Sequence, residues 1–317
     1  MRRLMPLVPK SMVKLFAKPY VAGDTLEKGI EAARTLLEER GILTSLDLLA
    51  EETRSSGEAE QFLQVYHRMV DACAAFPDPA TRPTVSIKPS SFTTQPMNGT
   101  GGHQAPGSDR AIREIAEHAR EKDVRLTIDM EDRHWTDWTL EIIRALHRDR
   151  FTGVGAVLQT RLQRTESDLR NLPEALRVRI VIGIYREPAE VAISDKKEMK
   201  ERMLRGAEYL LKKGHFVEFA THDEEYVRRF LEEVVPAAGA GGDRYEVQMI
   251  YGVPRKKFQD LLVAGKIGTQ GAVRVRVYVP FATSWDHAIA YCRRRLIENP
   301  SMASAVAKNL GRILLGR

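Results

Sequence analysis

The stretch VRVRVYVPFATSWDHAIAYCRRRLIE, residues 273–298, contains one example of each element from which most of the chain is built. Its first part, Val273 to Phe281, alternates apolar and polar residues and predicts a β-strand. After Pro280, Ser284 can cap a helix that continues through Glu298. The segment therefore predicts a strand followed directly by a helix.

The predicted helix carries a cationic face. Tyr291, Arg294, Arg295 and Glu298 are three or four residues apart, so they share one side of the helix. Two neighbouring guanidinium groups beside an aromatic ring suit the binding of a small carboxylate, because arginine binds that group through two parallel hydrogen bonds. The alternative reading of this segment is a solvated basic helix surface.

Composition indicates a soluble globular protein that works in a reducing compartment. The 317 residues suffice for one large domain or two ordinary ones. Cys73 and Cys292 form neither a disulfide framework nor a metal signature. No apolar run approaches the roughly 20 residues that span a bilayer, and no secretory signal is recognised. The expected location is the cytoplasm.

The first twenty residues are basic and partly apolar. Met1–Tyr20 contains five lysines and arginines and no acidic residue, within a chain of net charge +6. Such a segment is typical of contact with an anionic membrane surface, and the alternative is a helical arm packed on the domain. Nucleic acid is not an expected partner, because no binding motif accompanies the charge.

Eight strand-like runs alternate with helical patterns along the chain. The runs are Ser45–Leu49, Val85–Lys88, Arg125–Asp129, Gly155–Gln159, Arg179–Tyr185, Phe216–Ala220, Glu246–Tyr251 and Val273–Val279. This alternation predicts a distorted (β/α)₈ barrel of the TIM type over residues 41–317, with an N-terminal helical arm at 1–40 and a C-terminal helix over the active site. A doubly wound open sheet is the alternative, although no GxGxxG follows the first strand.

In such a barrel the active site lies at the carboxyl ends of the strands. Polar residues occur there on strand after strand. The residues selected by this rule are Glu51, Lys88, Asp129, Glu131, Gln159, Tyr185, Thr221, His222, Gln248 and Tyr278, with Arg179 at the start of the fifth strand.

With these residues in view, the chain resembles the monofunctional proline dehydrogenases, which are FAD-dependent enzymes on a distorted (β/α)₈ barrel. The resemblance covers about Thr44 to Asn299. It rests on nine segments in the same order: SLDLLAEE, VSIKPS, TIDMED, GAVLQT, RIVIGIYREP, FATHD, EVQMIYGV, VRVYVP and YCRRRLIEN.

The resemblance implies oxidation of L-proline to Δ1-pyrroline-5-carboxylate, the first step of proline catabolism to glutamate. Hydride passes to N5 of FAD and the electrons then pass to a membrane quinone. A quinone acceptor is consistent with a cytoplasmic protein that contacts the inner face of the cell membrane through Met1–Tyr20. Nothing in the sequence predicts the oligomeric state.

The resemblance also implies a substrate site. Arg294, Arg295 and Lys88 would bind the proline carboxylate, and Tyr278 and Tyr291 would pack against the ring. Asp129 would hold Lys88 or a tyrosine hydroxyl in place. Glu51 would pair with a clamp arginine when the site closes. An exposed Glu51 and a merely structural Asp129 are the alternatives.

A second set of residues is implied for the cofactor. Arg179 would lie near the flavin N5 and Gln159 at the pyrimidine edge. Thr221 and His222 would contact FAD from the sixth strand. The remaining members of the set are Gly183, Tyr185 and Glu298. His222 lies too far from cysteine and other histidines in sequence to suggest a metal site, and the alternative is a buried core histidine.

The chain departs from the family pattern at a few positions. Ile182 precedes Gly183 where the family usually has lysine, so a cation near the cofactor is missing, and Ile184 can narrow the pocket. These changes leave room for another cyclic amino acid, such as hydroxyproline or pipecolate. A barrel that binds a carboxylate ligand without redox chemistry is the competing class, and it predicts a colourless protein.

Overall fold

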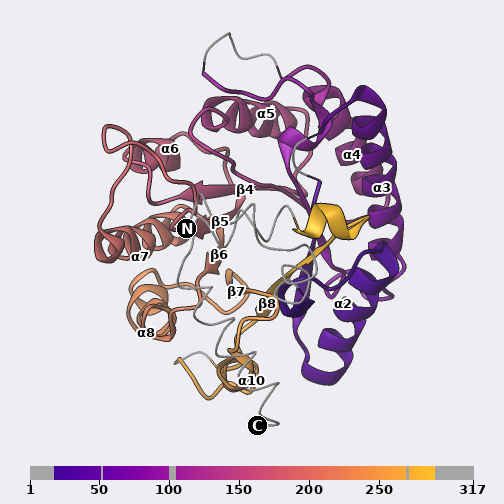
Figure 1. The fold of residues 1–317 in the computed structure, drawn as a ribbon. Coiled ribbons are helices and arrows are strands. Elements are labelled where there is room, and N and C mark those ends of the chain that lie inside the picture. The colour runs from indigo at the N-terminus through magenta and orange to yellow at the C-terminus, as the bar shows by residue number, and fades with distance from the viewer. Residues whose placement is uncertain (1–17, 51–52, 100–104, 269–270, 290–317) are drawn as a thin grey trace.

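A computed structural model of the chain describes residues 18–50, 53–99, 105–268 and 271–289. Eight parallel strands form a closed barrel in sequence order, which Figure 1 shows nearly along its axis. The strands are β1 (Leu43–Leu48), β2 (Thr84–Ile87), β3 (Leu126–Ile128), β4 (Val154–Gln159), β5 (Arg177–Val181), β6 (Phe216–Ala220), β7 (Tyr245–Ile250) and β8 (Val275–Phe281). The barrel closes where β1 pairs with β8. The predicted (β/α)₈ fold is confirmed, and the open-sheet alternative is wrong.

Helices surround the barrel on its outside (Figure 1). The α-helices are α2 (Leu26–Arg40), α3 (Ser56–Ala74), α4 (Ser108–Glu121), α5 (Thr136–Arg148), α6 (Thr165–Arg170), α7 (Lys196–Lys212), α8 (Glu224–Arg229), α9 (Val235–Ala237) and α10 (Lys256–Val263). Short 3₁₀ turns are η2 (Lys18–Tyr20) and η3 (Pro89–Phe92), and η4 (Phe230–Val234) is a π-helical turn between α8 and α9. Residues 285–289 are helical at the end of the described chain.

The alternation in β8 sorts its residues between two faces of the barrel wall. Val275, Val277 and Val279 are almost completely buried and belong to the main hydrophobic core. Arg276 and Tyr278 make side-chain hydrogen bonds to residues of other strands, which places them inside the barrel. Because successive side chains of a strand point to opposite faces, the apolar set packs under the helices and the polar set fills the interior.

Strand β5 differs from its prediction. Residues 179–185 were expected to be extended, with Arg179 at the start, but the strand runs from Arg177 to Val181. Gly183 then adopts a left-handed backbone conformation with φ +88°, which residues with side chains rarely adopt. The strand therefore ends before Gly183. Arg179 lies in its middle, and Tyr185 lies in the following loop.

Helix α2 attaches the N-terminal part of the described chain to the barrel. The Thr25 hydroxyl caps its start by accepting a hydrogen bond from the Lys28 N–H, and Gly41 ends it in the left-handed region. The helix packs against β1 and β8, and a side chain added at Gly29 would lie 3.2 Å from the Phe281 ring. The division of the chain at residue 40 remains a prediction, and residues 1–17 lie outside the described ranges.

Candidate active site

The carboxylate of Asp129 joins three strands at one end of the barrel. Asp129 follows β3, and its two oxygens accept hydrogen bonds from Arg179 Nη1 at 2.8 Å and from the Tyr278 hydroxyl at 2.6 Å. The ammonium group of Lys88 lies 3.5 Å from the same carboxylate. Side chains from the ends or interiors of β2, β3, β5 and β8 therefore meet at Asp129.

Lys88 is almost fully buried and has three oxygen partners. Its ammonium forms a short ion pair with Asp47 from β1 and donates a hydrogen bond to the Tyr278 hydroxyl at 3.2 Å. Burial disfavours the charge of Lys88, but the neighbouring Asp47, Tyr278 and Asp129 outweigh it and hold the pKa of Lys88 well above its usual value. Lys88 therefore stays charged.

The pKa values of Asp47 and Tyr278 are also raised, which for these two acids favours the neutral form. Burial raises the pKa of Asp47, and the nearby Asp129 adds to the effect while Lys88 opposes it. Burial and the carboxylates of Asp129 and Asp47 raise the pKa of Tyr278 well above its usual value. The phenol therefore stays protonated and donates a hydrogen bond to Asp129.

Arg179 is held from several directions inside the barrel. Besides Asp129, its guanidinium donates to Gln248 Oε1 on β7 at 2.7 Å and to the Ser86 hydroxyl on β2 at 3.3 Å. Its Nε also lies 3.4 Å from Glu218 Oε2 on β6. The guanidinium is 5.1 Å from the centre of the Tyr278 ring. These contacts fix its orientation beneath the strand ends.

Deeper in the barrel, a further layer of ion pairs supports this cluster. Arg276 donates to Glu246 at 2.6 Å, and Arg177 donates to Glu218 at 2.6 Å. Gln248 connects the layers, because its amide nitrogen donates to Glu246 at 2.7 Å while its oxygen accepts from Arg179. The interior is thus largely polar, whereas TIM barrels are more often filled by branched apolar side chains.

Glu131 joins three neighbouring strand ends. Its carboxylate accepts a hydrogen bond from the Ser90 N–H beyond β2 at 2.8 Å, and its backbone carbonyl accepts one from Gln159 Nε2 on β4 at 2.7 Å. Burial raises the pKa of Glu131 to about 7, and the hydrogen bond from Ser90 and the charge of Lys88 only partly oppose it.

The end of β6 presents a different kind of chemistry. His222 Nε2 accepts a hydrogen bond from the Ile250 N–H at 3.2 Å, so the proton of the neutral ring resides on Nδ1. Burial, helped by Arg255, lowers the pKa of His222 to about 4 and keeps the ring neutral. Nδ1 is buried and has no hydrogen-bond partner among the described residues. Thr221 lies beside it, and its hydroxyl accepts from the Asp223 N–H.

Gly183 lies against Gln159 without room for a side chain. A Cβ atom at Gly183 would be 2.5 Å from Gln159 Oε1. This closeness, together with the left-handed backbone, leaves glycine as the residue that fits at this position.

The structure brings together Lys88, Asp129, Arg179 and Tyr278, and places Gln159, Gly183, Tyr185, Thr221 and His222 at or just beyond the ends of β4, β5 and β6. Glu51, Tyr291, Arg294, Arg295 and Glu298 lie outside the described residues. Their roles remain predictions.

Asp47 was missed by sequence reasoning, although it pairs directly with Lys88. It lies within β1, two residues after Ser45, which itself hydrogen-bonds Thr84 inside the barrel at 2.6 Å. The sequence carried a signal, because a carboxylate on the same face of a buried strand as Ser45 needs an interior partner. Gln248 and Glu131 were noted at strand ends but were not assigned to the site.

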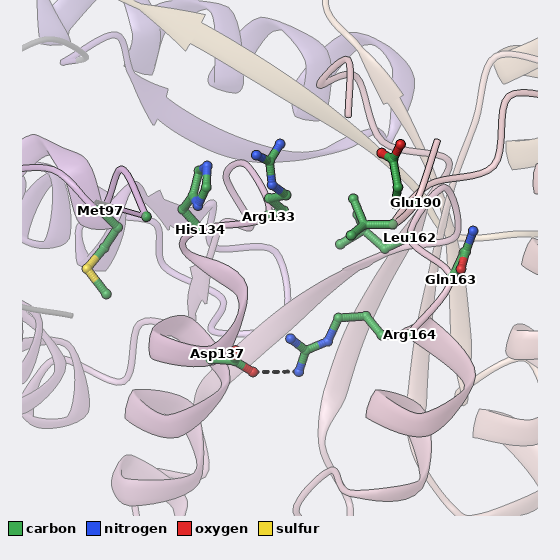
Figure 2. Close-up of a pocket in the computed structure, with 10 residues that line it drawn as sticks. Met97, Arg133, His134, Asp137, Leu162, Gln163, Arg164 and Glu190 are labelled. Carbon is green, nitrogen blue, oxygen red and sulfur yellow. Dashed lines mark hydrogen bonds and ion pairs between the residues drawn. The ribbon is translucent and has the colours of Figure 1, made fainter. Parts of the chain in front are cut away.

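A cavity of about 430 Å³ lies outside this cluster, between the N-terminus of α5 and the loop after β4. Figure 2 shows Arg164 reaching Asp137 across it at 2.6 Å. Its other lining residues include Met97, Arg133, His134 and Glu190. None of the predicted site residues lines the cavity, and the paired charges leave little net attraction for a charged ligand. We therefore place the site at the strand ends and not in this cavity.

Comparison with known sequences identifies close relatives over nearly the whole chain. The family model described as "Proline dehydrogenase" matches residues 30–308. "Proline dehydrogenase" of Deinococcus radiodurans is 34% identical over 302 residues, which is 93% of this chain and 89% of that protein. "Proline dehydrogenase 1" of Bacillus subtilis strain 168 is 30% identical over 298 residues, covering 94% and 91% of the two chains.

Solved structures share the fold. The crystal structure of proline utilization A from Bdellovibrio bacteriovorus superposes with a TM-score of 0.73 at 21% identity. The match covers 90% of this chain but 32% of that much longer protein. A variant of proline utilization A from Bradyrhizobium japonicum gives a TM-score of 0.70, also at 21% identity. These similarities establish the barrel architecture.

Proposed function

This chain belongs to the proline dehydrogenase family, and we propose that it oxidises L-proline to Δ1-pyrroline-5-carboxylate with FAD as the hydride acceptor. The observation that supports this most directly is the convergence of Lys88, Arg179, Tyr278 and Asp129 at the strand ends of the barrel. This is where catalytic residues of such barrels lie.

The residues at the ends of β4, β5 and β6 fit a flavin. The neutral His222 presents a buried N–H with no acceptor in the part of the chain that the structure describes, which suits the oxygen- and nitrogen-rich edge of such a ring. Gly183, which has no side chain, lets the Gln159 amide pack against the exit of β5. We propose that these residues hold FAD together with Gln159, Thr221 and Tyr185, and that Glu298 joins them from the last helix.

In the reaction, proline loses a hydride from the ring carbon beside nitrogen and a proton from nitrogen, and a C=N bond forms. Bound FAD would supply the hydride acceptor at N5 and deliver the two electrons to a membrane quinone. The chain's own task is to fix the ring carbon in near-contact geometry and to exclude water. The half-buried Tyr278 suits both, because its ring centre lies 5.8 Å from the Lys88 ammonium and 5.1 Å from the Arg179 guanidinium.

The charges of the described cluster explain why further cations are needed for the carboxylate. Lys88 and Arg179 are balanced by Asp47 and Asp129. Such a cluster has no excess positive charge, and Lys88 must exchange one of its weaker contacts to reach a substrate. We propose that Arg294 and Arg295 supply the excess charge, that Tyr291 packs on the ring, and that Glu51 pairs with an arginine when the site closes.

The test is the visible absorption spectrum of the purified protein before and after anaerobic addition of L-proline. Oxidised-flavin bands that bleach with proline support both cofactor and substrate. Bands that persist with proline but bleach with hydroxyproline or pipecolate favour the alternative ring substrates. Ile184, which departs from the family pattern, is the reason to test them. A colourless protein that does not take up FAD contradicts the proposal and leaves a carboxylate-binding barrel.

A membrane quinone as electron acceptor would require the protein to reach the membrane surface. We propose that the basic segment Met1–Tyr20 contacts an anionic membrane surface from the cytoplasmic side. Among the described residues no helix is long and apolar enough to cross a bilayer. Co-sedimentation with anionic vesicles, compared with a variant lacking residues 1–17, tests the contact. Equal sedimentation of the two proteins would argue against it.

A further inference from the structure

Arg161 lies at the junction of the β4 and β5 exits, beside the proposed cofactor residues. Its backbone N–H donates to the Ile182 carbonyl at 2.9 Å. Its side chain binds the next residue of the same segment, because Nε and Nη2 donate to the Gly183 carbonyl at 3.3 and 3.2 Å. The guanidinium therefore lies against Gly183, which itself touches Gln159.

The charge of Arg161 has no carboxylate partner among the described residues. Two arginines on the neighbouring loops do have one, since Arg133 pairs with Glu187 at 2.9 Å and Arg164 with Asp137 at 2.6 Å. Arg161 is only partly exposed, and burial lowers the pKa of its guanidinium, while the charge of Glu187, which is itself paired with Arg133, opposes this shift. Half-burying a cation whose side-chain hydrogen bonds within the described ranges go to a carbonyl oxygen is costly, and the cost is offset when an anion binds.

The sequence supplies an independent reason for a cation here. Position 182 is isoleucine where the family resemblance leads us to expect lysine beside the cofactor. Ile182 and Arg161 are directly hydrogen-bonded through their backbones. A guanidinium from the turn after β4 thus reaches the same strand exit from which the expected lysine is missing.

We propose that Arg161 is a cofactor-binding residue of this chain, supplying at the β5 exit the positive charge that Ile182 does not. This rests on the proposed use of FAD. The ligand chemistry is a negative charge of FAD, which comes either from the diphosphate, charged at all times, or from the pyrimidine side of the ring, charged after reduction.

The experiment measures FAD affinity without turnover, by titrating FAD into the apoprotein and following flavin fluorescence. Arg161→Gln keeps an N–H donor for Gly183 but removes the charge, and should weaken FAD binding about 10- to 100-fold, the range of a charge-assisted hydrogen bond. Arg161→Lys should stay close to the parent. Adding Ile182→Lys to Arg161→Gln should restore most of the affinity.

The matched control is Arg205→Gln, which removes one arginine charge from the exposed face of α7, where Arg205 pairs with Glu198. It should bind FAD as the parent does. This variant separates a local contact from the change in overall charge, which acts weakly at a distance in salt.

Two further measurements distinguish the sources of negative charge. If Arg161 meets the diphosphate, riboflavin binding and the flavin reduction potential are the same in Arg161→Gln and the parent. If Arg161 faces the ring, riboflavin also binds more weakly to the variant and its potential becomes more negative, because the reduced anion loses a stabilising cation. Either result supports the proposal.

Equal FAD affinity of Arg161→Gln and the parent overturns the proposal while leaving the flavoenzyme in place. A loss of affinity that Ile182→Lys does not restore, and that Arg161→Lys shares, also overturns it, because Arg161 would then act through the shape of the Gly183 loop. A parent apoprotein that binds no FAD overturns both this inference and the proposed function.

Discussion

The strand ends of the barrel divide into two chemically different halves. Around β1, β2, β3, β5 and β8 the polar side chains form ion pairs with one another, with Asp129 in contact with Lys88, Arg179 and Tyr278. Around the exits of β4, β5 and β6 there is a glycine in close contact and, counting partners among the described residues alone, a histidine with an unpartnered N–H and an arginine without a paired carboxylate. In the first half most charged groups pair with one another, although Asp47 Oδ2 and Glu218 Oε2 lack a hydrogen-bond partner among the described residues. The second half leaves hydrogen-bonding capacity to a ligand.

This difference indicates how the work is divided. Buried ion pairs rarely stabilise a fold relative to apolar residues, because desolvation offsets their attraction. Their value here lies in fixing the direction of Lys88 and Tyr278 before substrate arrives. The residues at the exits of β4, β5 and β6 gain further partners only when a large ligand binds, so they should affect ligand affinity more than folding.

Breaking the ion-paired cluster around Asp129 should have the largest effect. Asp129→Ala leaves Arg179 and Lys88 without one of their carboxylates and should destabilise the fold by about 3–5 kcal/mol. Proline turnover should fall to near background. Urea denaturation of the parent and the variant measures the first effect.

A surface pair provides the control for Asp129. Asp149 pairs with Arg113 at 2.9 Å in an exposed position, so Asp149→Ala should cost at most about 1 kcal/mol. Equal destabilisation by the two substitutions would mean that the buried cluster is not a cooperative unit.

The raised pKa of Glu131 makes the stability of the fold depend on pH. Its pKa rises from 4.5 to about 7 on folding, so the folded state binds more protons between these values. The contribution to stability is full below pH 4.5 and is lost as pH rises to about 7, a loss on the order of 3 kcal/mol.

Unfolding free energies measured from pH 4.5 to 7.5 test this. Glu131→Gln cannot titrate and can still accept the Ser90 hydrogen bond, so its stability should fall less with rising pH than that of the parent. Parallel curves for the two proteins would show that Glu131 does not titrate in this range.

The next largest effect is expected from adding a side chain at Gly183. Gly183→Ala adds a Cβ that would lie 2.5 Å from Gln159 Oε1 on a backbone with φ +88°. We expect a cost of about 1–3 kcal/mol in stability and weaker FAD binding.

Gly239→Ala is its matched control, because Gly239 has φ +60° but no neighbouring atom within 4 Å of an added Cβ. It should show backbone strain alone and bind FAD as the parent does. If both variants behave alike in FAD titrations, the close contact at Gly183 has no bearing on the cofactor.

The smallest expected effect concerns His222. Replacing it by phenylalanine removes the acceptor for the Ile250 N–H and the unpartnered Nδ1–H. A neutral hydrogen bond contributes about 1 kcal/mol, so FAD affinity should fall roughly fivefold. His118→Phe, at an exposed histidine paired with Asp71, is the control. An FAD affinity unchanged by His222→Phe would mean that Nδ1 does not face the cofactor.

Several predictions from the sequence depended on local patterns and agree with the structure. Sequence patterns located all eight strands. Lys88, Asp129 and Tyr278, which were selected from the strand ends, contact one another, while their roles remain a proposal. The error at β5 arose because a run of apolar residues continues past Val181, while the left-handed turn at Gly183 depends on its contact with Gln159. Periodicity does not report such a contact.

The sequence by itself determined the barrel, its order of elements and the family, since these follow from periodicity and from motifs that keep their order along the chain. Only the tertiary structure decided which charges meet. Asp47 and Lys88 are 41 residues apart and Arg179 and Ser86 are 93 apart, yet each pair is in contact inside the barrel. Partner choice depends on closure of the sheet, and closure brings distant strands to one interior that no local pattern encodes.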